Sequence, residues 1–170
     1  MTGPRAGRSL RSRSLSVNMS AATDVPALLD EFRAARRGLQ RRYTLVPSER
    51  RTVPPAPGQW SARDILAHIA AWIEEANDRI PRLLAGAPSL AYDLDAFNAA
   101  AVARAAEWTG DQTLAAFRRA ADRFEAIVGG TDAADIVDAE EALAWLRATA
   151  HDLMHEHFAE LERLADSDDA

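Results

Sequence analysis

The chain has 170 residues, of which 20 are basic, 26 are acidic and none is cysteine, and every basic residue is arginine. This composition excludes a disulfide framework, a cysteine nucleophile and lysine Schiff-base chemistry, so any bound metal must be held by His, Asp or Glu. No apolar run reaches the roughly 18 residues that a membrane span needs. We therefore expect a soluble, cytoplasmic protein without a membrane partner.

The first 22 residues differ in composition from the rest of the chain. They contain Arg5, Arg8, Arg11 and Arg13 and no acidic residue, and removing these four charges takes the formal net charge from −6 to −10. A body this acidic does not attract a phosphate backbone, so no nucleic-acid partner is expected. The Ser, Arg and Gly content predicts a disordered tail over residues 1–22, and we expect translation to start near Met19.

The first helix is predicted from Asp24 to Tyr43. Thr23 or Asp24 can cap its N-terminus, and Pro26 suits its first turn. Apolar residues follow at helical spacing, and prolines between residues 44 and 60 then predict a loop.

Three further helical regions follow this loop. Ser61 and Asp64 form the pattern of a capping box, which predicts a helix from there to about Leu84. The next region has two parts, over 92–107 and from a second capping pattern at Thr109 and Gln112 to about residue 129. The last helix is predicted from about Asp138, capped with Glu141, to about residue 165.

These patterns predict an all-α protein. Strand patterns are absent, and long helices with short connections, each with one apolar stripe, favour an antiparallel four-helix bundle. We expect residues 23–166 to form this bundle and residues 167–170 to form an acidic C-terminal tail.

The four histidines carry the first chemical signal. His68 shares a helix stripe with Asp64 and Trp72 and borders the apolar positions Ile65 and Ile69, so its side chain is expected to point into the bundle. A lone inward histidine is more often a hydrogen-bonded core residue than a metal ligand.

The other histidines lie in the last helix. In a regular helix His157 falls near the centre of the apolar stripe, whereas His151 and His155 fall at its edge and beyond. His157 is therefore best placed to meet His68, although His151 and His155, four residues apart, could also chelate a divalent metal. The stripe consists of Leu143, Leu146, Ala150, Leu153, His157, Leu161 and Leu164.

Two segments resemble a known family. The stretch from Trp60 to Trp72 has the form Trp-Ser-x-x-Asp-x-x-x-His-x-x-x-Trp, and residues 94–98 read Leu-Asp-Ala-Phe-Asn. The first stretch is similar to the start of the second helix in the DinB/YfiT-like superfamily of four-helix bundles, and the second resembles its ClbS/DfsB group most. The superfamily includes mycothiol-dependent isomerases, other thiol transferases and cyclopropane hydrolases.

The resemblance implies a divalent metal, Zn or Ni, bound by a histidine of the second helix and a pair in the last helix. His68 matches the first ligand. His157 matches the register of the pair's second member, which places Leu153 at the first position, a residue that cannot bind metal. Alternatively, His151 and His155 supply the pair, so the third ligand remains open.

The resemblance further implies a metal-dependent hydrolase or small-thiol transferase that acts on a small electrophile in stress or detoxification. Mycothiol or bacillithiol could supply the thiol. Asp64 and Asp95 are candidate bases and Asn98 a candidate substrate-orienting residue. Helix capping for the two aspartates and an interhelical hydrogen bond for Asn98 are the simpler interpretations.

Aromatic residues at helical spacing could line a substrate pocket, although such residues are more often core. The candidates are Trp72, Tyr92 and Trp108. The alternative function is non-enzymatic: a metal-free bundle that binds or sequesters a small molecule, or that serves for dimerisation. A homodimer is expected because related bundles often dimerise.

Overall fold

The computed structural model describes residues 24–91 and 93–166. The predicted N-terminal tail, the translation start near Met19 and the predicted C-terminal tail lie outside these described residues. Within them the chain forms helices and no strand, which confirms the predicted all-α fold. No helix in the described part is both long enough and apolar enough to cross a membrane.

The longer helices match the predicted regions to within a few residues. They are α1 (Val25–Leu45), α2 (Ala62–Leu84), α3 (Leu94–Arg104) and α4 (Gly110–Gly130). The rest of the chain forms α5 (Ala133–Asp138), α6 (Glu140–Arg147), α7 (Leu153–His155) and α8 (Phe158–Asp166), with a π-helical segment at Ala148–Asp152 and a 3-10 turn at Ser48–Arg50.

Side-chain caps explain where three of these helices begin. The Asp24 side chain accepts a hydrogen bond from the Ala27 amide at the start of α1. The capping boxes predicted for α2 and α4 are both present, at Ser61 with Asp64 and at Thr109 with Gln112. Each cap satisfies backbone amides that have no partner within the helix, so the chain enters each helix at a defined residue.

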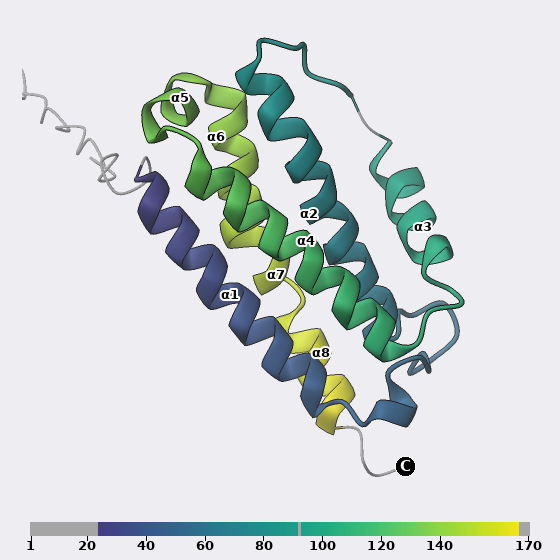
Figure 1. Ribbon diagram of the computed structural model, residues 1–170. Helices are drawn as coiled ribbons and strands as arrows, with labels where there is room; N and C mark the ends of the chain where they lie inside the picture. Colours follow the sequence, from purple (N-terminus) through teal and green to yellow (C-terminus); the bar gives the residue numbers. More distant parts are fainter. Residues whose placement is uncertain (1–23, 92, 167–170) are drawn as a thin grey trace, which may run out of the picture.

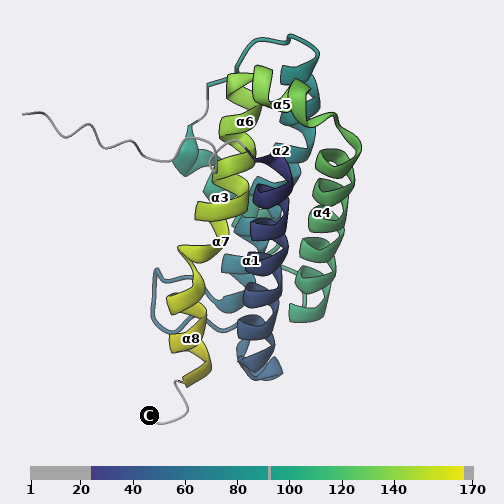
Figure 2. The ribbon, with the colours of Figure 1, turned by 90° about the vertical axis from the view of Figure 1, so that its left-hand side faces the viewer.

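The bundle consists of α1, α2, α4 and the final segment from α6 to α8 (Figures 1 and 2). Helix α1 runs antiparallel to α4, and α2 runs antiparallel to the final segment. Helices α2 and α4 run in the same direction, because α3 carries the chain back along the outside of α2 before α4 begins. The connection through α3 makes α2 and α4 parallel, whereas short connections alone had led us to expect that consecutive helices of the bundle run antiparallel.

Apolar side chains from all four parts of the bundle fill its centre. The largest fully buried side chains are Phe32, Leu39, Tyr43, Ile65, Leu66, Ile69, Ile73, Ile80, Phe117, Phe124, Ile136 and Leu146. The rings of Phe32 and Phe124 lie 4.5 Å apart and join α1 to α4. Burial of this apolar surface is the main force that holds the helices together.

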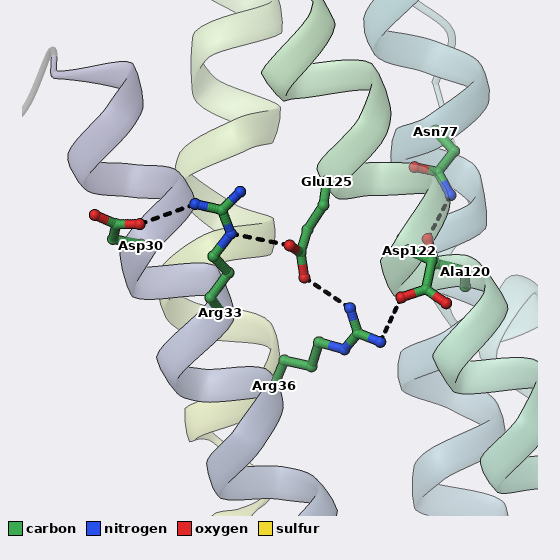
Figure 3. Close-up of polar contacts among 7 residues, drawn as sticks. All are labelled: Asp30, Arg33, Arg36, Asn77, Ala120, Asp122 and Glu125. Carbon is green, nitrogen blue, oxygen red and sulfur yellow. Dashed lines mark hydrogen bonds and ion pairs between the residues drawn. The ribbon is translucent and has the colours of Figure 1, made fainter.

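A chain of ion pairs joins α1 to α4 at the surface (Figure 3). Glu125 accepts hydrogen bonds from Arg33 Nε at 2.9 Å and from Arg36 Nη1 at 2.7 Å. Asp30 and Asp122 extend the chain at either end, at 3.0 Å from Arg33 and 2.6 Å from Arg36. Arg33 and Arg36 of α1 therefore bind the neighbouring helix α4.

The last helix differs from its prediction. The expected cap at Asp138 with Glu141 as partner is wrong, although α6 begins only two residues later, at Glu140. Asp138 is the last residue of α5, which Asp132 caps, and Ala139 caps α6 without a side-chain hydrogen bond. The helix is also not continuous. The π-helical segment interrupts it, and a turn at Glu156 and His157 precedes α8.

Candidate functional site

A cavity of about 590 Å³ opens between α2, α3 and the final segment of the chain. Six of its thirteen lining residues are aromatic or aliphatic and seven are polar or charged, and the exposed surface of the lining is mainly apolar, as in small-molecule sites. The indoles of Trp60, Trp72 and Trp145 form its walls, and the imidazoles of His68 and His157 lie beside them. The remaining lining residues are Asn98, Glu141, Ala144, Ala148, Thr149, Asp152, Leu153 and Glu156.

The loop before α2 places Trp60 in the cavity wall. Gly58 adopts a φ of +79°, a conformation that glycine adopts without strain, and the capping box at Ser61 then starts α2. About two turns further on, the ring of His68 lies 4.8 Å from the ring of Trp60. The end of the loop and the start of α2 thus supply one side of the site.

His157 reaches the same place from the other end of the chain. Its backbone amide closes a turn onto the Met154 carbonyl, and its own carbonyl accepts from Leu161 in the first turn of α8. The ring of His157 meets the ring of His68 edge to face, with centroids 5.2 Å apart. The structure therefore brings together the two histidines whose positions in the sequence predicted an inward direction.

The environment of His68 keeps its ring neutral. The pKa of His68 is lowered to about 4, mainly by burial and also by the nearby His157, while a hydrogen bond with Asn98 acts in the opposite direction. The side chain is only 7% exposed, and its Nδ1 atom has no hydrogen-bond partner. The site thus contains a neutral, buried imidazole, one nitrogen of which has no hydrogen-bond partner.

A carboxylate orients His157. The Nδ1 atom of His157 lies 3.1 Å from Oε2 of Glu160, one turn further along the chain. Because a carboxylate only accepts hydrogen bonds, Nδ1 carries the proton and the lone pair lies on Nε2. This is the arrangement in which a carboxylate fixes the tautomer of a catalytic histidine.

Asn98 connects α3 to the same cavity. Its Oδ1 atom accepts a hydrogen bond of 2.9 Å from Nε1 of Trp72. The Trp72 ring also packs on Phe97, with centroids 4.2 Å apart. Helix α3 is otherwise exposed, with only Ala101 fully buried, so these contacts are what hold it over the cavity.

The π-helical segment shapes the opposite wall. A π turn adds one residue to an α-helix and shifts everything after it around the helix axis. Met154 is consequently fully buried, whereas Leu153 is only partly buried and lines the cavity. Leu153 thus still packs against the core, as its place on the apolar stripe predicted, but Met154 takes the fully buried position.

The two candidate aspartate bases lie outside the cavity. Oδ2 of Asp64 accepts from the backbone amide and the hydroxyl of Ser61, and its Oδ1 accepts from Arg63. Those bonds occupy the carboxylate in capping α2. Asp95 is exposed in the first turn of α3. Of the three residues proposed for catalysis, only Asn98 lines the cavity.

The other predicted site residues are distributed as follows. Trp72 lines the cavity, Trp108 lines a smaller hollow between α2, α3 and α4, and Tyr92 lies outside the described residues. His151 is 69% exposed, with Nδ1 at 3.8 Å from a Glu31 carboxylate oxygen. His155 is also exposed, and its Nδ1 contacts the His151 carbonyl oxygen, so neither residue joins His68.

The number and type of side chains that could act as ligands decide whether this site can bind a metal ion. His68 and His157 supply two imidazoles, one of which has an unused buried nitrogen. A catalytic zinc site takes three protein ligands and a water molecule. Over residues 24–91 and 93–166 no group of three or more His, Cys, Asp or Glu side chains is disposed to hold a metal ion. The residues present therefore do not make up a three-ligand site.

Sequence reasoning missed several residues of the site. Trp145 was not singled out, and Trp60 was treated only as part of the family pattern. Glu160 was missed too, although its position three residues after His157 on a helix was a usable signal, because residues at this spacing are neighbours. The acidic lining residues gave no such signal, because exposed helix positions are commonly acidic.

Comparison with known proteins gives one match. The family model of the DinB superfamily matches residues 31–166, which is most of the chain. Neither the curated proteins nor the solved structures include a match. The match confirms the resemblance at the level of the superfamily, and the finer resemblance to the ClbS/DfsB group stays a prediction.

Proposed function

We propose, from the premise that this chain belongs to the DinB superfamily, that it is a hydrolase or small-thiol transferase. In this proposal His157 acts as general base and takes a proton from the nucleophile that attacks a small electrophile. The observation that carries the proposal is the hydrogen bond between Nδ1 of His157 and Glu160 beside an aromatic cavity. Electrophiles of this size are the compounds that detoxification removes.

The contact with Glu160 supports this role of His157. Because Nδ1 donates to Glu160, Nε2 is the nitrogen that accepts a proton from a nucleophile in the cavity. The negative charge of Glu160 stabilises the imidazolium that forms. The nucleophile is either water or a low-molecular-weight thiol such as mycothiol or bacillithiol.

An epoxide illustrates the proposed reaction. A water or thiol group attacks one ring carbon, its proton passes to Nε2 of His157, and the carbon–oxygen bond of the ring breaks. The imidazolium then returns the proton to the alkoxide oxygen, so that no proton is gained or lost overall. In this scheme the neutral His68 and Asn98 orient the substrate by hydrogen bonding rather than by charge.

Variants of the His157–Glu160 pair test the proposal. We would measure turnover of a panel of small epoxides, including styrene oxide, with water alone and with a thiol added. His157→Gln should lower kcat by about 100-fold or more, and Glu160→Gln by about 10- to 100-fold, because each removes part of the general base. His151→Gln is the matched control, since His151 is exposed and lies outside the cavity. Equal turnover in the His157 variant and the wild type would refute the proposal.

The alternative is a binding protein that does not turn its ligand over. The cavity walls favour it as the second candidate, because three indoles can hold an apolar ligand without any chemistry. Quenching of tryptophan fluorescence by the same epoxides, without formation of a diol or thioether, would support this alternative.

A further inference from the structure

The charged side chains of the cavity are all of one sign. Glu141, Asp152 and Glu156 contribute three carboxylates. Among the described residues that line it, none is arginine, although the chain as a whole contains 20 basic residues. The electrostatic potential inside the cavity is therefore negative, and it favours a ligand with a positive charge.

The aromatic walls have the same preference. The face of an indole ring carries partial negative charge and attracts organic cations, more strongly than the rings of Tyr or Phe. The rings of Trp72 and Trp145 lie 6.1 Å apart with an angle of 32° between their planes, and Trp60 lies against His68 and His157. Three indoles around one cavity are the composition of sites that bind ammonium groups.

The interior of the cavity offers a hydrogen bond as well. His68 is more than nine-tenths buried, lines the cavity, and has an Nδ1 atom without a partner. A buried polar atom of this kind is costly to leave unsatisfied, so it points to a ligand group that bonds to it. This observation is independent of the acidic residues, which lie nearer to solvent.

We infer that the cavity selects an organic cation, an amine or quaternary ammonium compound with a flat apolar body. The apolar body packs against the indoles, and the cationic group lies near Glu141, Asp152 and Glu156. The inference rests on the proposed function, because it adds to the small electrophile of that proposal a cationic group by which the cavity recognises it. An anionic substrate would meet three like charges among the lining residues. The guanidinium of Arg79 packs on the Trp145 ring at 4.7 Å, but it does not line the cavity and is paired with Glu75 at 3.5 Å.

Three matched probes test the charge preference without any reaction. Phenyltrimethylammonium, its neutral isostere tert-butylbenzene and the anion benzenesulfonate have similar size and differ in charge. Binding to the full chain would be followed by tryptophan fluorescence and by calorimetry. We expect the cation to bind about tenfold more tightly than the neutral isostere, and the anion to bind more weakly than both. Raising the salt concentration should weaken only the preference for the cation.

The chain supplies a closely matched pair of variants. Glu141 lines the cavity and accepts a hydrogen bond from the hydroxyl of Ser89, whereas its neighbour Glu140 is exposed and does not line the cavity. Glu141→Gln should weaken cation binding by about threefold and Glu140→Gln should leave it unchanged. Glu156→Gln, combined with Glu141→Gln, should abolish most of the preference for the cation.

The outcomes separate this inference from the proposed function. Tighter binding of the cation without turnover of any electrophile would support the inference and refute the proposed function. Turnover that depends on His157, combined with equal binding of the three probes, would refute the inference alone. Equal effects of Glu140→Gln and Glu141→Gln would also refute it, because the effect would then come from net charge and not from the cavity.

Discussion

The rings of His68 and His157 meet edge to face at 5.2 Å, one from the first half of α2 and the other from the turn before α8. Trp60 lies against both rings, and Glu160 accepts a hydrogen bond from Nδ1 of His157. The contact places one buried neutral imidazole beside one that a carboxylate orients. The two rings therefore have different chemical roles although they share one cavity.

The burial of His68 makes stability depend on pH. Its pKa is about 4 in the native state, below the usual value of about 6.5, so the unfolded state binds more protons between these values. The free energy of unfolding should therefore fall as the pH drops from about 6.5 to 4, by roughly 3 kcal/mol in total from this group. Urea unfolding between pH 7 and pH 4 measures it.

Comparison of two histidine variants isolates this contribution. In His68→Gln the difference in stability from the wild type should shrink as the pH falls, because the variant has no ring to protonate. His151→Gln should follow the wild type, since His151 is exposed. Parallel curves for the wild type and His68→Gln would show that His68 does not titrate in this range.

The ion pairs between α1 and α4 should contribute measurably to stability. Arg36 bridges Glu125 and Asp122, and the side chains of Arg36 and Glu125 are only 17% and 23% exposed. Arg36→Met should lower the free energy of unfolding by about 1 to 2 kcal/mol, because it leaves Glu125 with one partner. Chemical denaturation measures the change, and Arg37→Met at the neighbouring position should cost less than about 0.5 kcal/mol.

The π-helical segment should be dispensable for folding and essential for the cavity. Deleting Ala148 removes the extra residue and lets the apolar stripe continue in regular α-helical register. We expect the shortened chain to remain folded by circular dichroism, because the residues after the segment keep their register. We expect it to lose ligand binding, because Ala148, Thr149 and Asp152 of the segment itself line the cavity. Deleting Arg118 within regular helix α4 is the control and should unfold the protein, since it moves every later core residue of that helix out of register. Unchanged binding after deletion of Ala148 would contradict this role.

The metal content of the purified protein tests the expectation of zinc or nickel. The proposed base needs no metal, so turnover should survive treatment with a chelator followed by dialysis. Plasma mass spectrometry of protein purified without an affinity tag should show less than one first-row metal ion per chain. A stoichiometric metal that is lost in His68→Ala would contradict the proposed base and favour the metal-dependent chemistry that the family resemblance implies.

Interactions between residues that are close together in the sequence determined much of the fold. The caps at Asp24, Ser61 and Thr109 depend on residues within three positions of each other, so the helix starts could be predicted from the sequence. The inward direction of His68 likewise followed from helical periodicity within α2. The last helix was predicted less well, because a π turn leaves no signature in hydrophobic spacing and shifts Met154 into the fully buried position in place of Leu153.

The sequence by itself determined that the chain is helical, where α1, α2 and α4 start, and which two histidines point inward, because each of these depends on neighbours within a turn or two of helix. Only the tertiary structure decided that α2 and α4 run in the same direction, that His68 meets His157, and that Trp145 joins them in one cavity. Those relationships depend on how helices distant in the sequence pack against one another, and packing responds to the shapes of all the side chains together.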